Sequence, residues 1–144
     1  MVMLIRLMTV EDIPEVSLLH ENLFSQAFNF IDYAVQQDFY YGIVIEVDCT
    51  IVGYLVGQII FEMADLFYVA IDPRYRSLGY GKLLVERFIL DASENGGENM
   101  TLEVRRSNYV AIHLYEQCGF LSAGIRKNYY ADSEDAVLMT RKIN

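Results

Sequence analysis

The sequence of 144 residues contains no tryptophan and only two cysteines, two histidines and two prolines. Two cysteines, Cys49 and Cys118, are too few for the disulfide framework of a small secreted protein. His20 and His113 lie far apart in the sequence and give no spacing typical of a metal site, so we expect no metal. No stretch rich in serine and glycine divides the chain, so we expect a single domain over residues 1–144.

Long apolar runs are also missing. The longest, Ile51 to Phe61, is interrupted by Gln58, whereas a membrane-spanning helix needs about 18 apolar residues. The first eight residues include Arg6 and have no cleavage site of small residues, so we expect no signal peptide. We therefore expect a cytoplasmic protein without a membrane partner.

Basic residues are scarce in the first part of the chain. Residues 1–65 contain ten acidic residues and one basic residue, Arg6, whereas residues 66–144 contain ten of each. The whole net charge of −9 therefore belongs to residues 1–65, and the isoelectric point is near 4.6. Because binding to a phosphate backbone requires a basic face, we expect no nucleic-acid partner.

Hydrophobic periodicity predicts the element order β-α-α-β-β-β-α-β-α-β-β, a mixed α/β (α+β) fold. The predicted strands are Val2–Leu7, Gly42–Val47, Ile51–Phe61, Leu66–Ile71, Met100–Val104, Phe120–Tyr130 and Ala136–Lys142. The predicted helices run from Thr9 to about Phe24, from Asn29 to Val35, across Leu84–Ala92, and from Asn108 to Cys118. The strand Leu66–Ile71 is apolar throughout, which predicts that both of its faces are buried.

A glycine-containing segment, Arg76-x-x-Gly79-x-Gly81-Lys82, lies between a predicted strand and a predicted helix. Such a segment can bind an anion, because glycines allow close approach and free N–H groups at a helix start point at the ligand. A plain strand-to-helix turn would explain the two glycines equally well. The segment is neither a Walker loop nor a dinucleotide fingerprint, because the Gly-Lys-Ser/Thr and third-glycine positions are not matched.

Several motifs together resemble those of the GNAT acetyltransferases. The run Val69-Ala70-Ile71-Asp72-Pro73 followed by Arg76-x-x-Gly79-x-Gly81 resembles the acetyl-CoA signature of that superfamily. The segments Leu102–Asn108 and Ala111–Phe120 match the later part of its pattern, and Arg126–Tyr130 with Glu134–Ala136 is similar to the C-terminal hairpin of the RimI group, the ribosomal-protein alanine N-acetyltransferases. The resemblance covers about residues 66–142.

The resemblance implies a GNAT-like, mostly antiparallel central sheet flanked by about four helices, with acetyl-CoA as co-substrate. Backbone groups of Val69, Ala70 and Ile71 would bind the pantetheine arm and the acetyl carbonyl, in the manner of an added strand. The pyrophosphate would lie on Arg76, Ser77, Leu78, Gly79, Tyr80, Gly81 and Lys82. Asn108 would hydrogen-bond the cofactor, and it can cap the following helix at the same time.

The resemblance also assigns two catalytic residues. Glu103 would take a proton from the substrate amine, directly or through water, and Tyr115 would protonate the departing thiolate. Without the resemblance, Glu103 reads as a solvated strand residue and Tyr115 as a core tyrosine. Cys118 follows a helix C-terminus, where the helix dipole disfavours a thiolate, so we expect direct attack in a ternary complex rather than an acetyl-enzyme.

The roles of the two histidines and of two tyrosine pairs are open. His20 lies in the apolar stripe of the first helix and reads as a packed histidine, whereas His113 lies opposite Tyr115 and reads as exposed. The pairs Tyr40–Tyr41 and Tyr129–Tyr130 either line a substrate slot or cover sheet edges, and we take the second as the default.

The acceptor is less defined than the cofactor. The RimI resemblance implies a protein N-terminal α-amine, such as the N-terminal alanine of ribosomal protein bS18. However, the RimI group usually has a Pro-Trp pair in the loop after the first helix, and this chain has Phe24-Ser25-Gln26-Ala27-Phe28 there. The alternatives are a small-molecule amine, such as a polyamine or an aminoglycoside, and a non-catalytic acyl-CoA-binding module. The acidic residues 1–65 favour a cationic acceptor, unless they form only a solvated face. The oligomeric state is open between monomer and homodimer.

Overall fold

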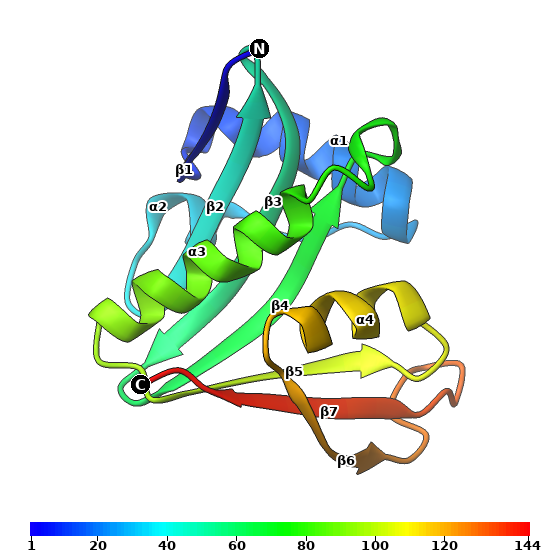
Figure 1. Ribbon diagram of the computed structural model, residues 1–144. Helices are drawn as coiled ribbons and strands as arrows, with labels where there is room; N and C mark the ends of the chain where they lie inside the picture. Colours follow the sequence, from blue (N-terminus) through cyan, green and yellow to red (C-terminus); the bar gives the residue numbers. More distant parts are fainter.

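The computed structural model describes residues 1–144 and contains one seven-stranded sheet with helices on both faces (Figure 1). The strands are β1 (Met3–Leu7), β2 (Tyr40–Val47), β3 (Thr50–Ile60), β4 (Met63–Ile71), β5 (Asn99–Arg105), β6 (Leu121–Arg126) and β7 (Ala136–Lys142). The helices are α1 (Ile13–Phe24), α2 (Ile31–Val35), α3 (Tyr80–Glu94) and α4 (Tyr109–Gln117), with short 3-10 turns at Val10–Asp12 and Pro73–Tyr75. The predicted element order and fold class are confirmed.

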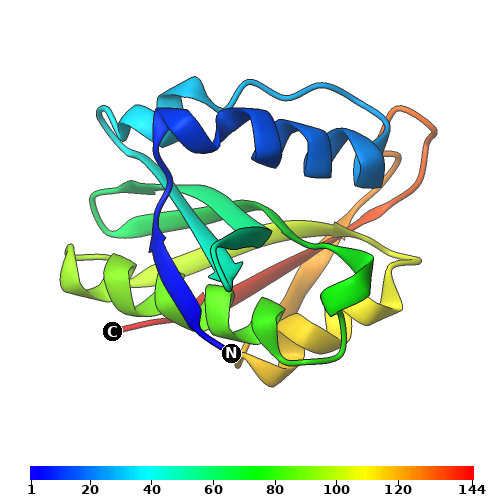
Figure 2. The same cartoon turned by 90° about the horizontal axis from the view of Figure 1, so that it is seen from above.

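The helices form two outer layers around the sheet (Figure 2). Helices α3 and α4 cover one face, where a core of 22 buried residues includes Leu84 and Phe88 of α3 and Tyr115 of α4. Helices α1 and α2 cover the other face over a smaller core of nine buried residues, among them Val16 and Tyr54. No helix combines the length and apolarity that a membrane crossing requires.

Hydrogen bonds to a charged side chain, Asp12, stabilise the start of α1. The Thr9 backbone N–H donates to the Asp12 carboxylate at 2.8 Å, as the spacing of these two residues predicts. The Arg6 guanidinium of β1 donates to both oxygens of Asp12, at 2.7 and 2.9 Å, and holds the pKa of that carboxyl below its usual range. These contacts orient α1 so that Val16 and His20 face the sheet, where both are buried.

The sheet divides between β4 and β5. The strand order is β1-β2-β3-β4-β5-β7-β6, and only β4 and β5 run parallel. These two strands pair only over Met63–Asp65 opposite Asn99–Thr101, and beyond that point they spread apart (Figure 1). The edge of β4 that faces β5 therefore has no strand partner over residues 66–71.

The prediction that both faces of Leu66–Ile71 are buried is wrong. Val56 and Gly57 of β3 pair with Tyr68 and Leu66, so Phe67 is an unpaired bulge residue, and its side chain is 40% exposed. Val69 and Ile71 are only partly buried, because β4 has no neighbouring strand on one side here. A continuous apolar run does not reveal that the sheet opens along it.

Candidate active site

The opening between β4 and β5 contains the free backbone edge of Val69, Ala70 and Ile71. On its other edge, β4 pairs with β3, with Leu55 opposite Val69 and Gly53 opposite Ile71. The unpaired edge leaves backbone N–H and C=O groups available to an extended ligand, which can bind as an added strand. The Ile71 carbonyl accepts a hydrogen bond from Arg76 Nε at 3.3 Å, which links this edge to the following loop.

The glycine segment forms the start of α3, as predicted. Gly79 has φ +86°, a left-handed conformation that favours glycine, and a side chain added there would meet no atom within 4 Å. The first backbone bond of the helix runs from the Leu83 N–H to the Gly79 carbonyl, so the N–H groups of Tyr80, Gly81 and Lys82 have no partner within the helix. These three groups and the open space beside Gly79 suit a phosphate-containing ligand.

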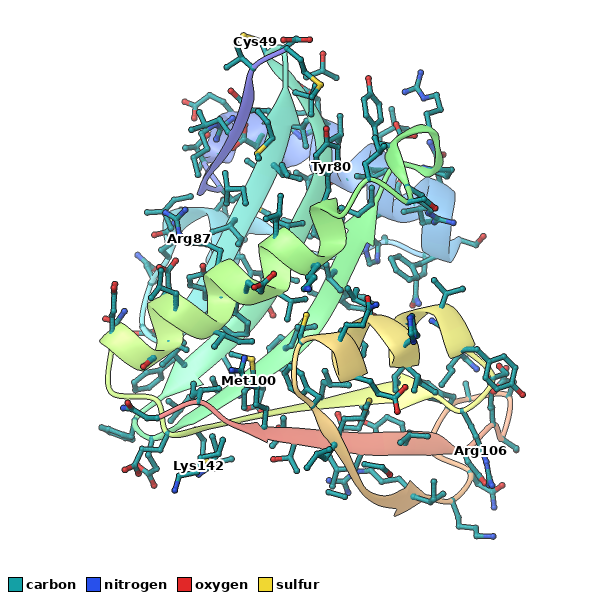
Figure 3. All side chains as sticks on the ribbon, viewed as in Figure 1. Cys49, Tyr80, Arg87, Met100, Arg106 and Lys142 are labelled. Carbon is teal, nitrogen blue, oxygen red and sulfur yellow. The ribbon has the colours of Figure 1, made fainter.

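The side chains around the start of α3 differ in their exposure to solvent. Arg76 and Lys82 are exposed, as are Ser77 and Leu78, and can reach a ligand anion. Tyr80, in contrast, points its ring into the α3 core, so only its backbone faces the loop (Figure 3).

Asn108 lies at the turn between β5 and α4 and caps the helix. Its Oδ1 atom accepts a hydrogen bond from the Ala111 N–H at 3.2 Å. Its side-chain NH₂ group makes no hydrogen bond and can still donate to a ligand. The capping role is therefore confirmed, and the cofactor contact stays a prediction.

Tyr115 lies on the inner side of α4, and its side chain is 7% exposed. Burial raises the pKa of its phenol, and the neighbouring Cys118 raises it further. The hydroxyl forms no hydrogen bond within the chain. A phenol that stays protonated and has a free O–H is suited to donate a proton.

Glu103 lies on β5, on the face opposite Tyr115. Its neighbours Leu102 and Val104 belong to the core under α3 and α4, so strand alternation places Glu103 toward the α1 face. Its side chain is 32% exposed and accepts a hydrogen bond from Arg126 Nε at 3.2 Å. The carboxylate is therefore accessible, not enclosed among apolar groups.

The two predicted catalytic residues approach the opening from opposite sides of the sheet. Tyr115 belongs to the α4 layer, whereas Glu103 faces the α1 side. Because β4 and β5 separate beyond Asp65 and Thr101, the sheet itself does not close the space between those two sides. A ligand that passes through the opening can meet a proton acceptor on one face and a proton donor on the other.

Comparisons with known proteins show the family to which the chain belongs. Residues 7–120 match the model of the acetyltransferase (GNAT) family. This chain is a member of the GNAT family.

A relative from Salmonella typhimurium, named ribosomal protein bS18-alanine N-acetyltransferase, is 36% identical over 112 residues, which cover 76% of each chain. The Escherichia coli protein of the same name is 40% identical over 95 residues, and this match spans 64% of its length. The crystal structure of the Escherichia coli ribosomal-protein-S18-alanine N-acetyltransferase superposes with a TM-score of 0.88 at 31% identity, covering 99% of this chain and 95% of that one. The resemblance to GNAT enzymes of the RimI group is thereby confirmed.

Three residues outside the predicted GNAT site lie as expected. His113 is exposed on α4, and His20 is completely buried against the sheet. Cys118 is buried, and its burial raises the pKa of its thiol, so it is a poor nucleophile. Cys49 is exposed at the tip of the β2–β3 hairpin (Figure 3), and neither cysteine forms a disulfide.

The loop that lacks the Pro-Trp pair is rich in aromatic contacts. The His20 ring lies 4.7 Å from the ring of Phe24, 5.4 Å from that of Phe28 and 4.9 Å from that of Tyr68, measured between centroids. Its Nδ1 atom hydrogen-bonds the Tyr54 hydroxyl, and its Nε2 atom is buried without a partner. Phenylalanines and a histidine thus fill the space between α1 and β4 in this GNAT protein.

The two rings of the first tyrosine pair lie on opposite faces of the sheet. Tyr41 stacks on Phe88 at 4.7 Å, and its hydroxyl donates to Asp91 of α3 at 2.6 Å, so it is a core residue. Tyr40 points to the opposite face and packs edge-on against Tyr33 of α2 at 4.9 Å. The alternation along β2 therefore separates the two rings.

Two polar groups near Glu103 were not predicted. Asp65 of β4 accepts hydrogen bonds from Gln58 at 2.9 Å and from Thr101 at 2.5 Å, which ties β3, β4 and β5 together where the opening begins. Arg105 contacts the loop between β6 and β7. Strand alternation placed Thr101 and Arg105 on the Glu103 face, but no sequence signal identified their distant partners.

Proposed function

We propose that this protein is an acetyl-CoA-dependent N-acetyltransferase that transfers the acetyl group to a protein N-terminal α-amine. The observation that carries the proposal is the opening between β4 and β5, with free N–H groups at the start of α3 on one side. Membership of the GNAT family and the names of the bacterial relatives support the same activity.

The residues present fit acetyl-CoA as co-substrate. The N–H groups of Tyr80, Gly81 and Lys82, with the exposed Arg76 side chain, would hold the pyrophosphate. The free edge of Val69–Ile71 would hold the pantetheine arm, and the Asn108 amide would add a hydrogen bond. When bound there, acetyl-CoA supplies the acetyl group as an activated thioester.

The chain's residues would then move two protons. Glu103 accepts the proton that the amine must lose, directly or through a water molecule, so that the nitrogen lone pair can form the new amide bond. Tyr115 donates its phenolic proton to the sulfur as the carbon–sulfur bond breaks, and is reprotonated from solvent. The buried Cys118, with its raised thiol pKa, argues for direct attack in a ternary complex without an acetyl-enzyme.

The acceptor side supports a cationic partner. Residues 1–65, which form α1, α2 and the first hairpin, contain ten acidic residues and one basic residue. An acidic surface attracts a basic protein N-terminus and speeds its association. A ribosomal protein such as bS18, acetylated in the cytoplasm, is an acceptor of this kind.

Thiol release from acetyl-CoA tests the proposal. The protein is incubated with acetyl-CoA and, in separate reactions, with basic peptides that have a free N-terminus, a polyamine and an aminoglycoside. We expect turnover with the peptides. Turnover with the small amines alone would overturn the protein acceptor, and acetyl-CoA binding without turnover of any amine would indicate a non-catalytic module.

A further inference from the structure

An open groove lies at the end of the sheet opposite the proposed active site. It is bounded by the start of β2, the turn from β3 to β4 and the end of α3, its volume is about 400 Å³, and five of its eight lining residues are hydrophobic. Figure 1 shows the end of α3 and the β3–β4 turn beside the C-terminus. Helix α3 has 15 residues and is therefore about 22 Å long, so the groove lies that far from the free N–H groups at the helix start.

Two exposed phenylalanines form the apolar part of the groove. Phe61, in the turn between β3 and β4, is 74% exposed, and Phe39, just before β2, is 45% exposed. Their ring centroids lie 5.7 Å apart, a distance typical of an aromatic pair. Ile59 and Tyr40 extend the apolar lining beside them. Contiguous apolar side chains that stay exposed are typical of a surface that another molecule covers.

The backbone at Phe61 shows that the turn itself does not require this ring. Ile60 pairs with Met63, so Phe61 and Glu62 form a two-residue hairpin turn. Phe61 has a φ of +53°, a left-handed conformation that favours glycine and is unfavourable for a bulky residue. Glycine would therefore make a more stable turn, and the exposed ring adds nothing to the core. The phenylalanine is explained by a contact outside the chain.

Four acidic residues surround the groove. Asp38 lines it, Glu62 belongs to the β3–β4 turn, and Glu94 precedes Asn95, another lining residue. The Glu98 N–H donates to the Glu62 carbonyl at 2.7 Å, which brings the fourth acidic residue to the same turn. All four side chains are exposed, and none of them takes part in the eight ion pairs of the protein. We call them the rim carboxylates.

Basic residues at this end of the sheet do not balance the rim carboxylates. Arg87 of α3 is paired with Asp91 at 3.4 Å, and Lys142 lies on β7 opposite Asn99 (Figure 3). One unpaired lysine therefore stands against four unpaired carboxylates, and the surroundings of the groove keep an excess of negative charge.

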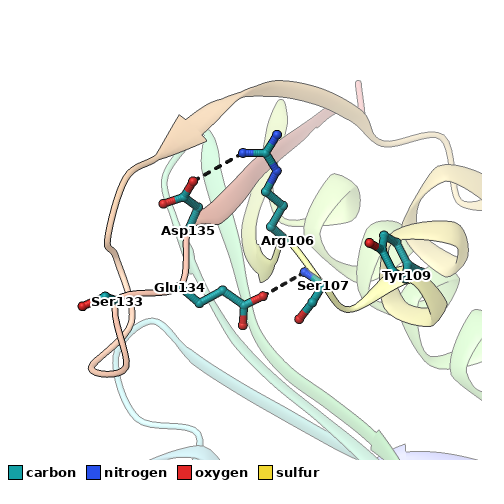
Figure 4. Close-up of a pocket in the computed structure, with 6 residues that line it drawn as sticks. All are labelled: Arg106, Ser107, Tyr109, Ser133, Glu134 and Asp135. Atoms are coloured by element: carbon teal, nitrogen blue, oxygen red, sulfur yellow. Dashed lines mark hydrogen bonds and ion pairs between the residues drawn. The ribbon is translucent and has the colours of Figure 1, made fainter.

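A second hollow, beside the turn after β5, has a different character (Figure 4). Tyr109 is the one hydrophobic residue among its six lining residues. Its carboxylates have partners within the chain, because Glu134 accepts from the Ser107 N–H at 2.9 Å and Asp135 pairs with Arg106 at 3.4 Å. Unpaired charge beside an exposed apolar surface is therefore particular to the groove at the end of α3.

The charge of the rim decides which partner fits. A second copy of this chain, bound about a two-fold axis, would place the rim carboxylates opposite themselves, and like charges repel. Nucleic acid and an anionic membrane surface are repelled in the same way. A basic segment of another protein has the complementary charge, and an apolar side chain in that segment can pack on the two exposed phenylalanines.

We propose that this groove is a docking site for a basic segment of a partner protein, which packs an apolar side chain against Phe39 and Phe61. The rim carboxylates attract the segment, and the rings hold its apolar side chain. The docking site is separate from the site of acetyl transfer, because the two lie at opposite ends of α3.

Peptide binding tests the docking site. A lysine-rich peptide with one central phenylalanine, blocked at its N-terminus and labelled with a fluorophore, is titrated with the protein, and fluorescence anisotropy gives the Kd. We expect saturable binding that weakens about tenfold when serine replaces the peptide's phenylalanine, and about as much when glutamine replaces its lysines. No saturable binding, or equal affinity for the glutamine peptide, would overturn the proposal.

Phe61→Gly is the sharpest variant, because glycine suits the left-handed backbone and the protein should fold at least as well as the parent. We expect the lysine peptide to bind about tenfold more weakly to it. Glu62→Gln combined with Glu98→Gln should weaken binding about threefold. Leu121→Ser is the matched control, since Leu121 is 72% exposed on β6 and does not line the groove. Equal affinity of Phe61→Gly and Leu121→Ser would overturn the role of the ring.

Two further measurements identify where the peptide binds and what else covers the groove. In NMR spectra, the amides of Phe39, Ile59, Phe61 and Asn95 should shift on binding, and shifts confined to the start of α3 or to the opening between β4 and β5 would contradict the docking site. Sedimentation should show a monomer without peptide, and a dimer lost in Phe61→Gly would assign the groove to a second copy instead. The blocked peptide needs no acetyl-CoA, so these results do not depend on the proposed acetyl transfer.

Discussion

The two faces of the sheet are built differently. On the α3 and α4 face, regular amphipathic helices enclose 22 buried residues, and the start of α3 leaves backbone N–H groups that we propose bind the cofactor. On the α1 and α2 face, the core has nine buried residues, and aromatic rings and side-chain ion pairs supply much of the order. The proposed ligand site on one face therefore comes from one short segment of the chain, whereas the contacts named on the other face join residues far apart in the sequence.

The largest expected effect on turnover comes from substituting one residue on each face of the sheet. Glu103→Gln removes the proposed proton acceptor on one face and Tyr115→Phe removes the proposed proton donor on the other, each with little change of shape. We expect kcat to fall about 10²- to 10⁴-fold in each variant, while acetyl-CoA affinity changes less than about twofold. Single-turnover rates and equilibrium binding of acetyl-CoA measure the two quantities separately.

Glu116→Gln and His113→Gln are the controls, because both side chains are exposed on the outer side of α4. Their rates should match that of the parent protein. If Glu103→Gln and Tyr115→Phe also keep full activity, the assignment of acid and base to the two faces is wrong.

A second comparison concerns two glycines at the two ends of α3. Gly79 and Gly96 flank α3, with φ of +86° and +90°, and each has open space where a side chain would lie. Alanine at either position should cost about 1–2 kcal/mol of unfolding free energy, because both require a left-handed backbone. Only Gly79→Ala should also weaken acetyl-CoA binding, by about tenfold, since Gly79 adjoins the free N–H groups of α3. Equal acetyl-CoA affinity in both variants would contradict the placement of the pyrophosphate.

The sequence predicted the α3 and α4 face better than the α1 and α2 face. The order of elements, a helix start next to the glycine segment and the cap at Asn108 follow from spacing within a few residues. The bulge at Phe67 and the contacts of Arg105 could not be predicted, because they depend on register and on partners 27 and 29 residues away. The prediction for Tyr40 and Tyr41 treats the two rings alike, whereas Tyr41 contacts α3 and Tyr40 packs against α2. The two environments differ because different helices cover the two faces of the sheet, which the sequence does not show.

His20, which is buried between α1 and the sheet, predicts a pH dependence of stability. Burial lowers the pKa of His20 below its ordinary value of 6.5, so below pH 6.5 the unfolded chain binds a proton that the folded chain excludes. Unfolding free energy should therefore fall as the pH drops below 6.5, by at most about 1.4 kcal/mol per pH unit. Denaturant unfolding between about pH 7 and pH 5.5 measures this slope, apart from most carboxylate titration.

Comparison of the two histidines isolates the effect. His20→Leu should flatten the slope, whatever its effect on overall stability, and the exposed His113→Gln should leave the slope unchanged. A slope that persists in His20→Leu would assign the pH dependence to other groups.

The smallest expected effect concerns the negative charge of residues 1–65. If the acidic residues 1–65 attract the acceptor, raising the salt concentration should increase the KM for a basic peptide, by about threefold over the physiological range. The KM for a neutral peptide of equal length should stay constant. A basic peptide whose KM does not respond to salt would show that the acidic residues form only a solvated face.

The most direct test of the central claim is the position of the acetyl group in the product. A peptide with a free N-terminal α-amine and an internal lysine is incubated with the protein and acetyl-CoA, and fragmentation mass spectrometry locates the modification. We predict acetylation of the α-amine alone. Acetylation of the lysine side chain, or an acetylated protein with an unmodified peptide, would contradict direct transfer to a protein N-terminus.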